Sequence, residues 1–249
     1  VAVIGAGLMG SGIAAHVANA GFPVTLLDIV PKDASNRNII AESAVNNMLK
    51  PVKMGSPTPL MHRKNAKLIT VGNLEDDLKL INDADLIIEV VLEKLEIKHD
   101  VFQKIDKFRK KNSIVTSNTS TIPREMLLRG MPESFAKDFM ISHFFNPPRY
   151  LRLLEIIAGN EVSKEKVEAI TKFCDLSLGK EVVICNDTPG FIGNRIGTYW
   201  TLVGMIEAVK LGLTVEEADA VMGRPIGAPK TGIFGLLDVV GLDLIPHVT

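Results

Sequence analysis

The first half of the chain alternates short, continuously apolar runs with longer segments of helical periodicity. Five runs rich in β-branched residues predict strands, at residues 1–4, 24–28, 68–71, 86–91 and 113–117. Apolar residues recur with helical spacing after the first run, over 9–19, and between the last two, over 95–110. Strands that are apolar on both faces and alternate with helices predict a parallel sheet covered by helices on both sides.

The pattern changes beyond residue 139. Two apolar runs, 139–145 and 151–157, are separated by a segment that contains Pro147 and Pro148. Two prolines exclude a helix there, so this segment predicts a turn and the flanking runs can form a strand pair. A helix over 163–178 and a last strand over 182–185 are expected next.

A domain boundary is expected at residues 186–190, where Pro189 and Gly190 interrupt the pattern. Beyond them we expect only helices, one over 191–211 and another that begins with the capping-box spacing of Thr214 and Glu217. The predicted organisation is a larger α/β domain, 1–186, followed by a smaller all-helical domain, 187–249. The chain starts inside a strand and stops without a helix-stop signal, so we expect it to be part of a longer protein whose helical domain continues.

Composition narrows the classes of function. The chain has 249 residues, with 28 Lys and Arg against 29 Asp and Glu, and this balance gives no electrostatic case for nucleic acid binding. It contains no apolar run long enough for a membrane span. Its two cysteines, Cys174 and Cys185, show no metal-ligand or redox spacing, so no metal site is expected and the sequence fits a reducing compartment.

A glycine-rich fingerprint follows the first predicted strand and opens the first predicted helix. The first glycine of such a loop permits a tight turn, the second lets the backbone approach a pyrophosphate, and the third allows close helix–strand packing. Asp28 ends the second strand, where an acidic residue binds the ribose 2′-hydroxyl of NAD and repels the 2′-phosphate of NADP. The sequence therefore predicts a Rossmann-type doubly wound sheet that binds NAD through Gly5, Gly7, Leu8, Met9, Gly10 and Asp28.

The second chemical signal is the pair His143 and Glu155. They lie 12 residues apart around the predicted turn, so antiparallel pairing of the two strands would bring them nearly opposite each other. A carboxylate beside an imidazole fixes its tautomer and stabilises the imidazolium, which suits a general base. Spacing alone leaves a structural histidine with a satisfied hydrogen bond as an equal alternative.

Several motifs in one order resemble the L-3-hydroxyacyl-CoA dehydrogenases of fatty-acid β-oxidation. They are the fingerprint, Ser-Asn-Thr-Ser at 117–120, His-Phe-Phe-Asn-Pro at 143–147, Glu155, Asp-Thr-Pro-Gly-Phe-Ile-Gly-Asn-Arg at 187–195 and Leu-Asp-Val-Val-Gly-Leu-Asp at 237–243. The resemblance covers essentially the whole chain and is strongest to the long bacterial form, in which this unit is fused to an enoyl-CoA hydratase-like region.

The resemblance implies a role for each matching position. His143 would exchange the proton of the substrate 3-hydroxyl while C3 exchanges hydride with NAD, and Glu155 would steady the imidazolium. Ser120 and Asn194 would hold the reacting oxygen and the thioester, although turn and helix-start chemistry alone can explain both. Glu93, Lys98 and Asn118 would lie near the nicotinamide and its ribose, the alternative for the first two being a solvated helix start.

A stretch without acidic residues, 43–74, is a candidate site for coenzyme A. A local positive patch suits the phosphates of coenzyme A, and a solvated helical hairpin with chance clustering is the equal alternative. The candidate contacts are Lys50, Lys53, Arg63 and Lys64.

Three functions remain open. The first is an NAD-dependent (S)-3-hydroxyacyl-CoA dehydrogenase; the second uses the same chemistry on a free hydroxy acid, such as a sugar acid. The third is a non-enzymatic NAD-binding structural or sensing protein, which would need none of the four residues His143, Glu155, Ser120 and Asn194. For the first function, the resemblance implies an acyl-CoA substrate and a homodimer or a larger multifunctional chain. It also implies the bacterial cytoplasm or, in a eukaryote, the mitochondrial matrix.

Overall fold

A computed structural model describes residues 1–50 and 58–240. The chain divides into two compact units, residues 1–187 and 188–249. Each unit is built around its own packed elements. The first contains all the strands of the described chain, and the second contains only helices.

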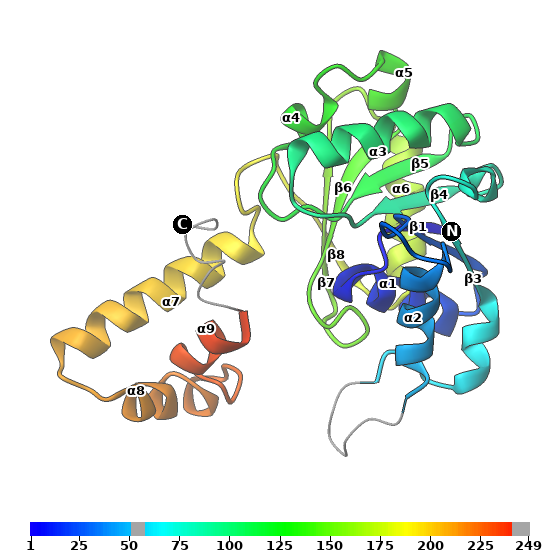
Figure 1. Cartoon of the computed structure of the whole chain (residues 1–249). Coiled ribbons are helices and arrows are strands. Elements are labelled where there is room, and N and C mark those ends of the chain that lie inside the picture. The colour runs from blue at the N-terminus through cyan, green and yellow to red at the C-terminus, as the bar shows by residue number, and fades with distance from the viewer. Residues whose placement is uncertain (51–57, 241–249) are drawn as a thin grey trace. The chain divides into compact units, whose positions relative to one another are not determined.

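The first unit is an eight-stranded sheet in the order β3-β2-β1-β4-β5-β6-β7-β8 (Figure 1). The strands are β1 (Ala2–Ile4), β2 (Val24–Asp28), β3 (Ile69–Asn73), β4 (Leu86–Glu89), β5 (Ile114–Ser117), β6 (Phe139–Phe144), β7 (Leu153–Ala158) and β8 (Glu181–Ile184). Strands β1 to β6 are parallel, and their order is that of a dinucleotide-binding doubly wound sheet. The predicted α/β class is confirmed.

Helices cover both faces of this sheet. On one face, α1 (Leu8–Asn19), α2 (Ile39–Met48) and α6 (Lys164–Lys172) share one apolar core with the strands. On the other face, α3 (Leu95–Phe108) contributes Phe102 to an aromatic cluster with Phe135 and Phe139. The short helices α4 (Arg124–Leu128) and α5 (Glu133–Ala136), the latter carrying Phe135, join β5 to β6.

Strands β6 and β7 form the predicted antiparallel pair. The expected start of the second strand at residue 151 was wrong, because residues 147–151 form a turn in which the amides of Tyr150 and Leu151 both donate to the Pro147 carbonyl. The helix expected over 163–178 is confirmed: α6 (Lys164–Lys172) continues without a break into the π-helical η3 (Phe173–Ser177).

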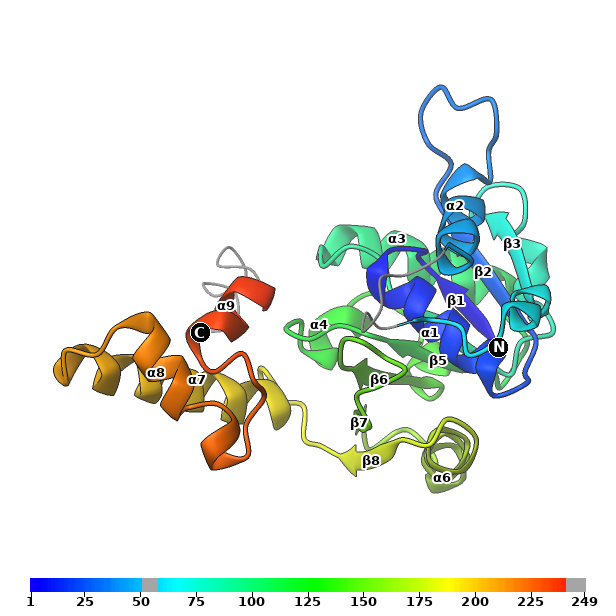
Figure 2. The same ribbon diagram turned by 90° about the horizontal axis from the view of Figure 1, so that it is seen from below.

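The second unit contains α7 (Gly193–Lys210), α8 (Val215–Val221), the short η4 (Arg224–Ile226) and α9 (Phe234–Val240). Helix α8 contacts both α7 and α9 (Figures 1 and 2). Its predicted capping box is confirmed, because Thr214 accepts from the Glu217 amide and Glu217 accepts from the Thr214 amide. Within the described residues, no helix has both the length and the apolar character that a membrane crossing needs.

The buried His16, in helix α1, makes the stability of the first unit depend on pH in the acid range. Its Nε2 lies 2.9 Å from the Leu178 carbonyl, and its buried Nδ1 has no hydrogen-bond partner among the described residues. Burial, reinforced by the nearby Lys180 charge, lowers the pKa of His16 to about 4, from an ordinary value of 6.5. Protonation at Nδ1 therefore places a second N–H donor where nothing accepts it.

We expect stability to fall between pH 6.5 and pH 4 because of this histidine. In that window the unfolded chain binds the proton and the folded chain does not, so acid favours unfolding by at most about 3 kcal/mol. His16→Gln keeps a side-chain donor for Leu178 and removes the titration. Urea unfolding at pH 7 and pH 4.5 should show a smaller acid loss for the variant, and equal losses would refute the assignment.

Candidate active site

The glycine fingerprint forms the turn between β1 and α1. Gly5 has φ +106°, and a Cβ there would lie 2.5 Å from the Val90 carbonyl oxygen. A Cβ on Gly10 would meet the Gly5 carbonyl oxygen at 1.8 Å, whereas a Cβ on Gly7 would meet nothing within 4 Å. The loop therefore packs tightly at its two ends and is open at its centre, where α1 begins without a side-chain cap. This geometry fits a pyrophosphate at a helix N-terminus.

Leu8 and Met9 form the first turn of α1, and Leu8 is 74% exposed. The carboxylate of Asp28, at the end of β2, is fixed at the loop that precedes this helix. It accepts hydrogen bonds from the Ala6 amide, within the fingerprint loop, and from the Ile29 amide at 2.6 Å. Its charge is thus held at the loop, in the position expected for the ribose-binding acid.

His143 and Glu155 are direct neighbours across β6 and β7. They occupy the same register position, and His143 Nδ1 lies 2.7 Å from Glu155 Oε2. Glu155 is fully buried and His143 is 5% exposed, with its ring 4.5 Å from that of Phe145. The predicted opposition of the two residues is confirmed. The contact of Glu155 with Nδ1 fixes the orientation of this imidazole ring.

Asn118 joins the ends of two parallel strands. It directly follows β5, and its Oδ1 accepts from the Phe144 amide at 2.9 Å. Phe144 comes immediately after His143 in the chain. Asn118 therefore fixes the backbone beside the histidine, at the edge of the sheet where the fingerprint loop also lies.

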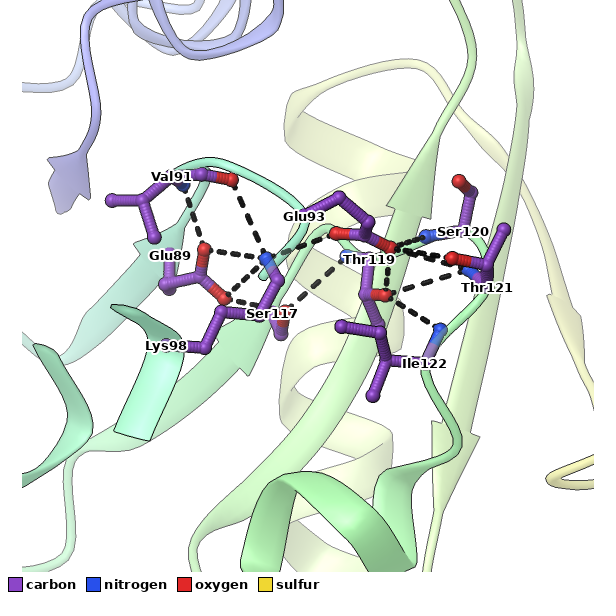
Figure 3. Close-up of polar contacts among 9 residues, drawn as sticks. All are labelled: Glu89, Val91, Glu93, Lys98, Ser117, Thr119, Ser120, Thr121 and Ile122. Carbon is purple, nitrogen blue, oxygen red and sulfur yellow. Dashed lines mark hydrogen bonds and ion pairs between the residues drawn. The ribbon is translucent and has the colours of Figure 1, made fainter. Parts of the chain in front are cut away.

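Lys98 lies between two carboxylates (Figure 3). It is 1% exposed, and its Nζ is 2.8 Å from Glu89 Oε1 and 3.1 Å from Glu93 Oε2. The alternative of a solvated helix start was wrong for Lys98, because α3 turns this side chain into the protein. Glu89 also accepts from Ser117 Oγ at 2.6 Å, and burial raises the pKa of Glu89 despite these partners.

Glu93 holds the turn that carries Ser120. Its Oε1 accepts from the Thr119 hydroxyl, from the Ser120 amide at 3.1 Å and from the Thr121 hydroxyl at 3.0 Å. Partial burial opposes its charge, but Lys98 and the hydroxyl groups keep the pKa of Glu93 below its ordinary value. In Figure 3 the Ser120 hydroxyl points away from this network. A hydroxyl in that position can donate to a bound ligand.

The remaining candidates are spread over other elements. Asn194 lies in the first turn of α7, in the second unit. Lys50 follows α2, while Arg63 and Lys64 begin η1 (Arg63–Leu68); all three are exposed. Helix α1 contacts both α2 and η1. Lys53 lies outside the described residues. The segment is not a helical hairpin throughout, because η1 is a short 3₁₀ helix that leads into β3.

A pocket of about 260 Å³ opens beside the start of α1. Helix α1 contributes one wall, the 146–150 turn another, and Thr58 and Pro59 a third. The 146–150 turn follows β6, the strand that carries His143.

Several buried charged residues were missed from the sequence, among them Glu89 and Lys180. Glu89 ends an otherwise apolar strand, and Lys98 follows nine residues later. That spacing was the sequence signal that could have indicated a buried ion pair. Lys180 had no such signal, because its contacts come from residues about 30 positions earlier. Over the described residues, no cluster of three or more His, Cys, Asp or Glu side chains could hold a metal ion.

Known proteins resemble this chain over its whole length. It is 46% identical over 247 residues to a Deinococcus radiodurans protein named as a 3-hydroxyacyl-CoA dehydrogenase, covering 99% of this chain and 70% of that protein. It is 45% identical to a Rickettsia felis protein named as a fatty acid oxidation complex trifunctional enzyme, covering the whole of this chain but only 34% of that protein. Relatives named as mitochondrial hydroxyacyl-coenzyme A dehydrogenases also match, for example 33% identity in Rattus norvegicus.

The fold and the family agree with these relatives. The crystal structure of (S)-3-hydroxybutyryl-CoA dehydrogenase from Ralstonia eutropha superposes with a TM-score of 0.80 and 26% identity, covering 99% of this chain and 84% of that one. Residues 1–188 match the 3-hydroxyacyl-CoA dehydrogenase NAD binding domain, and residues 190–249 match the C-terminal domain of the same family. The chain belongs to the 3-hydroxyacyl-CoA dehydrogenase family of NAD-dependent oxidoreductases.

Proposed function

We propose that this chain catalyses the reversible NAD-dependent oxidation of (S)-3-hydroxyacyl-CoA to 3-oxoacyl-CoA. The main observation in support is the buried His143–Glu155 pair, with its 2.7 Å contact. It lies toward the edge of the sheet formed by the carboxyl ends of the parallel strands, where the glycine loop follows β1. Nucleotide binding alone needs no such pair. The family match supports the choice of substrate.

The chain's own residues account for the proton and the orientation. His143 Nε2 accepts the proton of the substrate 3-hydroxyl, while Glu155 at Nδ1 fixes the tautomer and stabilises the resulting imidazolium. Ser120, on the turn held by Glu93, donates to the reacting oxygen, and Asn194 assists in holding the thioester. Bound NAD supplies the acceptor for the hydride that leaves C3. Glu93 and Asn118 would hold the nicotinamide and its ribose, and the buried Lys98 would act there through its ion pair with Glu93.

The test is NADH oxidation by the purified protein with acetoacetyl-CoA and longer 3-oxoacyl-CoA substrates. Free 3-oxo acids and sugar-acid analogues serve as the comparison. We expect turnover only with the thioesters. Turnover of the free acids alone would assign the same chemistry to a different substrate class, and NADH binding without any turnover would indicate a structural or sensing protein.

We propose the acid-free stretch 43–74 as the site for the coenzyme A phosphates. Neutralising Lys50, Arg63 and Lys64 together should raise the Michaelis constant for acetoacetyl-CoA several-fold at low salt, and high salt should remove most of the difference because it screens exposed charges. The matched control neutralises the exposed Lys111, Lys164 and Lys172. An equal effect of both triple variants would favour a solvated, non-binding surface.

We further propose that the chain acts as a homodimer or as part of a longer multifunctional chain with a hydratase-like region, in bacterial cytoplasm or, for a eukaryotic source, the mitochondrial matrix. Exposed apolar side chains along α7, including Ile196, Tyr199 and Val209, support a further partner for that helix. The Rickettsia relatives, of which this chain spans about a third, support the multifunctional form. Sedimentation of the purified protein tests the dimer.

A further inference from the structure

Lys180 is a buried lysine that is not among the candidate site residues. It immediately precedes β8 and is 2% exposed. Its ammonium group donates to the Pro148 carbonyl and, at 2.7 Å, to the Leu151 carbonyl, about 30 residues earlier in the chain. It also lies 5.6 Å from the ring centre of Phe144, the residue that follows His143. One cation thus contacts both the end of β6 and the turn beyond it.

The turn at 147–151 depends on this cation for its outer hydrogen bonds. Within the turn, the Tyr150 and Leu151 amides both donate to the Pro147 carbonyl at 3.0 Å. The Pro148 and Leu151 carbonyls instead point to Lys180. The buried Pro148 carbonyl needs a donor, and an ammonium group with three N–H bonds can serve it and the partly buried Leu151 carbonyl at once.

The same turn forms a wall of the pocket beside the fingerprint helix. Residues 146–150 face Leu8, Ser11 and Gly12 of α1 across a volume of about 260 Å³. A Cβ on Gly12 would lie 3.1 Å from Pro148 Cδ, so the turn packs directly against α1. A displacement of this turn would therefore change the width of the pocket.

The surroundings of Lys180 leave its charge poorly compensated. Among the described residues it makes no ion pair with a carboxylate, and its acceptors are two carbonyls and an aromatic face. Burial lowers its pKa to about 8. A lysine kept in such a place is unfavourable for stability unless its donors are needed there.

We propose that Lys180 is a positioning residue of the active site: it holds the 147–151 turn against α1 and thereby sets the shape of the substrate pocket. The kinetic consequence rests on the proposed function. His143 stays anchored to Glu155 by the β6–β7 ladder, so the loss of Lys180 should affect binding more than the chemical step.

The test compares Lys180→Met with Lys172→Met. Methionine keeps an unbranched apolar side chain against Phe144 but removes the donors, and Lys172 is an exposed lysine at the end of α6. For Lys180→Met we expect the Michaelis constant for acetoacetyl-CoA to rise about tenfold with kcat within threefold. Lys172→Met should leave both constants unchanged.

Hydrogen–deuterium exchange supplies a readout that does not depend on turnover. In Lys180→Met, the peptide covering 146–152 should exchange about tenfold faster while β1 and β2 keep their protection. Lys180→Arg keeps a charged donor for both carbonyls and should recover most of the protection. If the methionine variant is too unstable to purify, Lys180→Gln takes its place: its shorter, neutral amide cannot serve both carbonyls, so exchange in 146–152 should still rise, and exchange equal to that of the unmodified protein would overturn the positioning role.

The outcomes separate the proposal from the proposed function. If the unmodified protein does not turn over acyl-CoA substrates, the proposed function fails, while the exchange data still decide the role of Lys180. Unchanged exchange in 146–152 together with an unchanged Michaelis constant would overturn the positioning role. Faster exchange across the whole sheet, with a lower kcat and the same Michaelis constant, would also overturn it, because that result indicates general destabilisation.

Discussion

Replacing His143 by alanine should reduce turnover of acetoacetyl-CoA by about 10²–10⁴-fold, the usual contribution of a general base. The imidazole is held by Glu155 at Nδ1, so alanine removes both the proposed base and the contact that orients it. Affinity for NADH should stay within a few-fold, because the glycine loop and Asp28 belong to other strands. Steady-state kinetics and NADH fluorescence titration measure the two effects separately.

Glu155→Gln provides a graded comparison for the same site. It retains the shape and a hydrogen-bond acceptor but removes the charge that stabilises the imidazolium, so the rate should fall, though less than for the alanine variant. His99→Ala is the control, since His99 lies on α3 and contacts only the Met126 carbonyl among the hydrogen bonds of the described residues. Near-normal turnover of His143→Ala would show that the assignment of the base is wrong.

The local pattern of the sequence was sufficient for the main features of the first unit. Continuous apolar runs located the strands, and the glycine spacing placed a tight turn between β1 and α1, which the +106° φ of Gly5 confirms. The pairing of His143 with Glu155 was also predictable, because both lie at equal distances from one proline-containing turn and an antiparallel register follows from that symmetry.

Contacts between distant segments were not predictable in this way. Glu89 and Lys98 come from adjacent elements, yet their burial depends on Ser117 from the next strand and on the direction in which α3 packs. Lys180 is buried because two carbonyls of the 147–151 turn converge on it, which requires β6, β7 and β8 to be in place. Hydrophobic periodicity reports which positions face a core, and it carries no information on which polar groups meet there.

The second large effect expected is in cofactor choice: catalytic efficiency with NAD should exceed that with NADP by at least about a hundredfold, equivalent to roughly 2.7 kcal/mol. The Asp28 carboxylate is held at the fingerprint loop by the Ala6 and Ile29 amides, so it cannot easily turn away from an approaching 2′-phosphate. Two negative charges brought together there without a cation repel each other and lose solvation. Initial rates with each cofactor at saturating acyl-CoA give the ratio.

Asp28→Asn is the informative variant because the amide oxygen can still accept one of the two backbone hydrogen bonds while the charge is removed. We expect the ratio of catalytic efficiencies, NAD over NADP, to fall in this variant, because the efficiency with NAD decreases and the efficiency with NADP increases. Asp33→Asn is the matched control, since Asp33 is an exposed residue in the segment that follows β2. Comparable efficiencies with both cofactors in the unmodified protein would show that the Asp28 charge does not face the ribose. A ratio unchanged by Asp28→Asn would assign the discrimination to loop shape instead of charge.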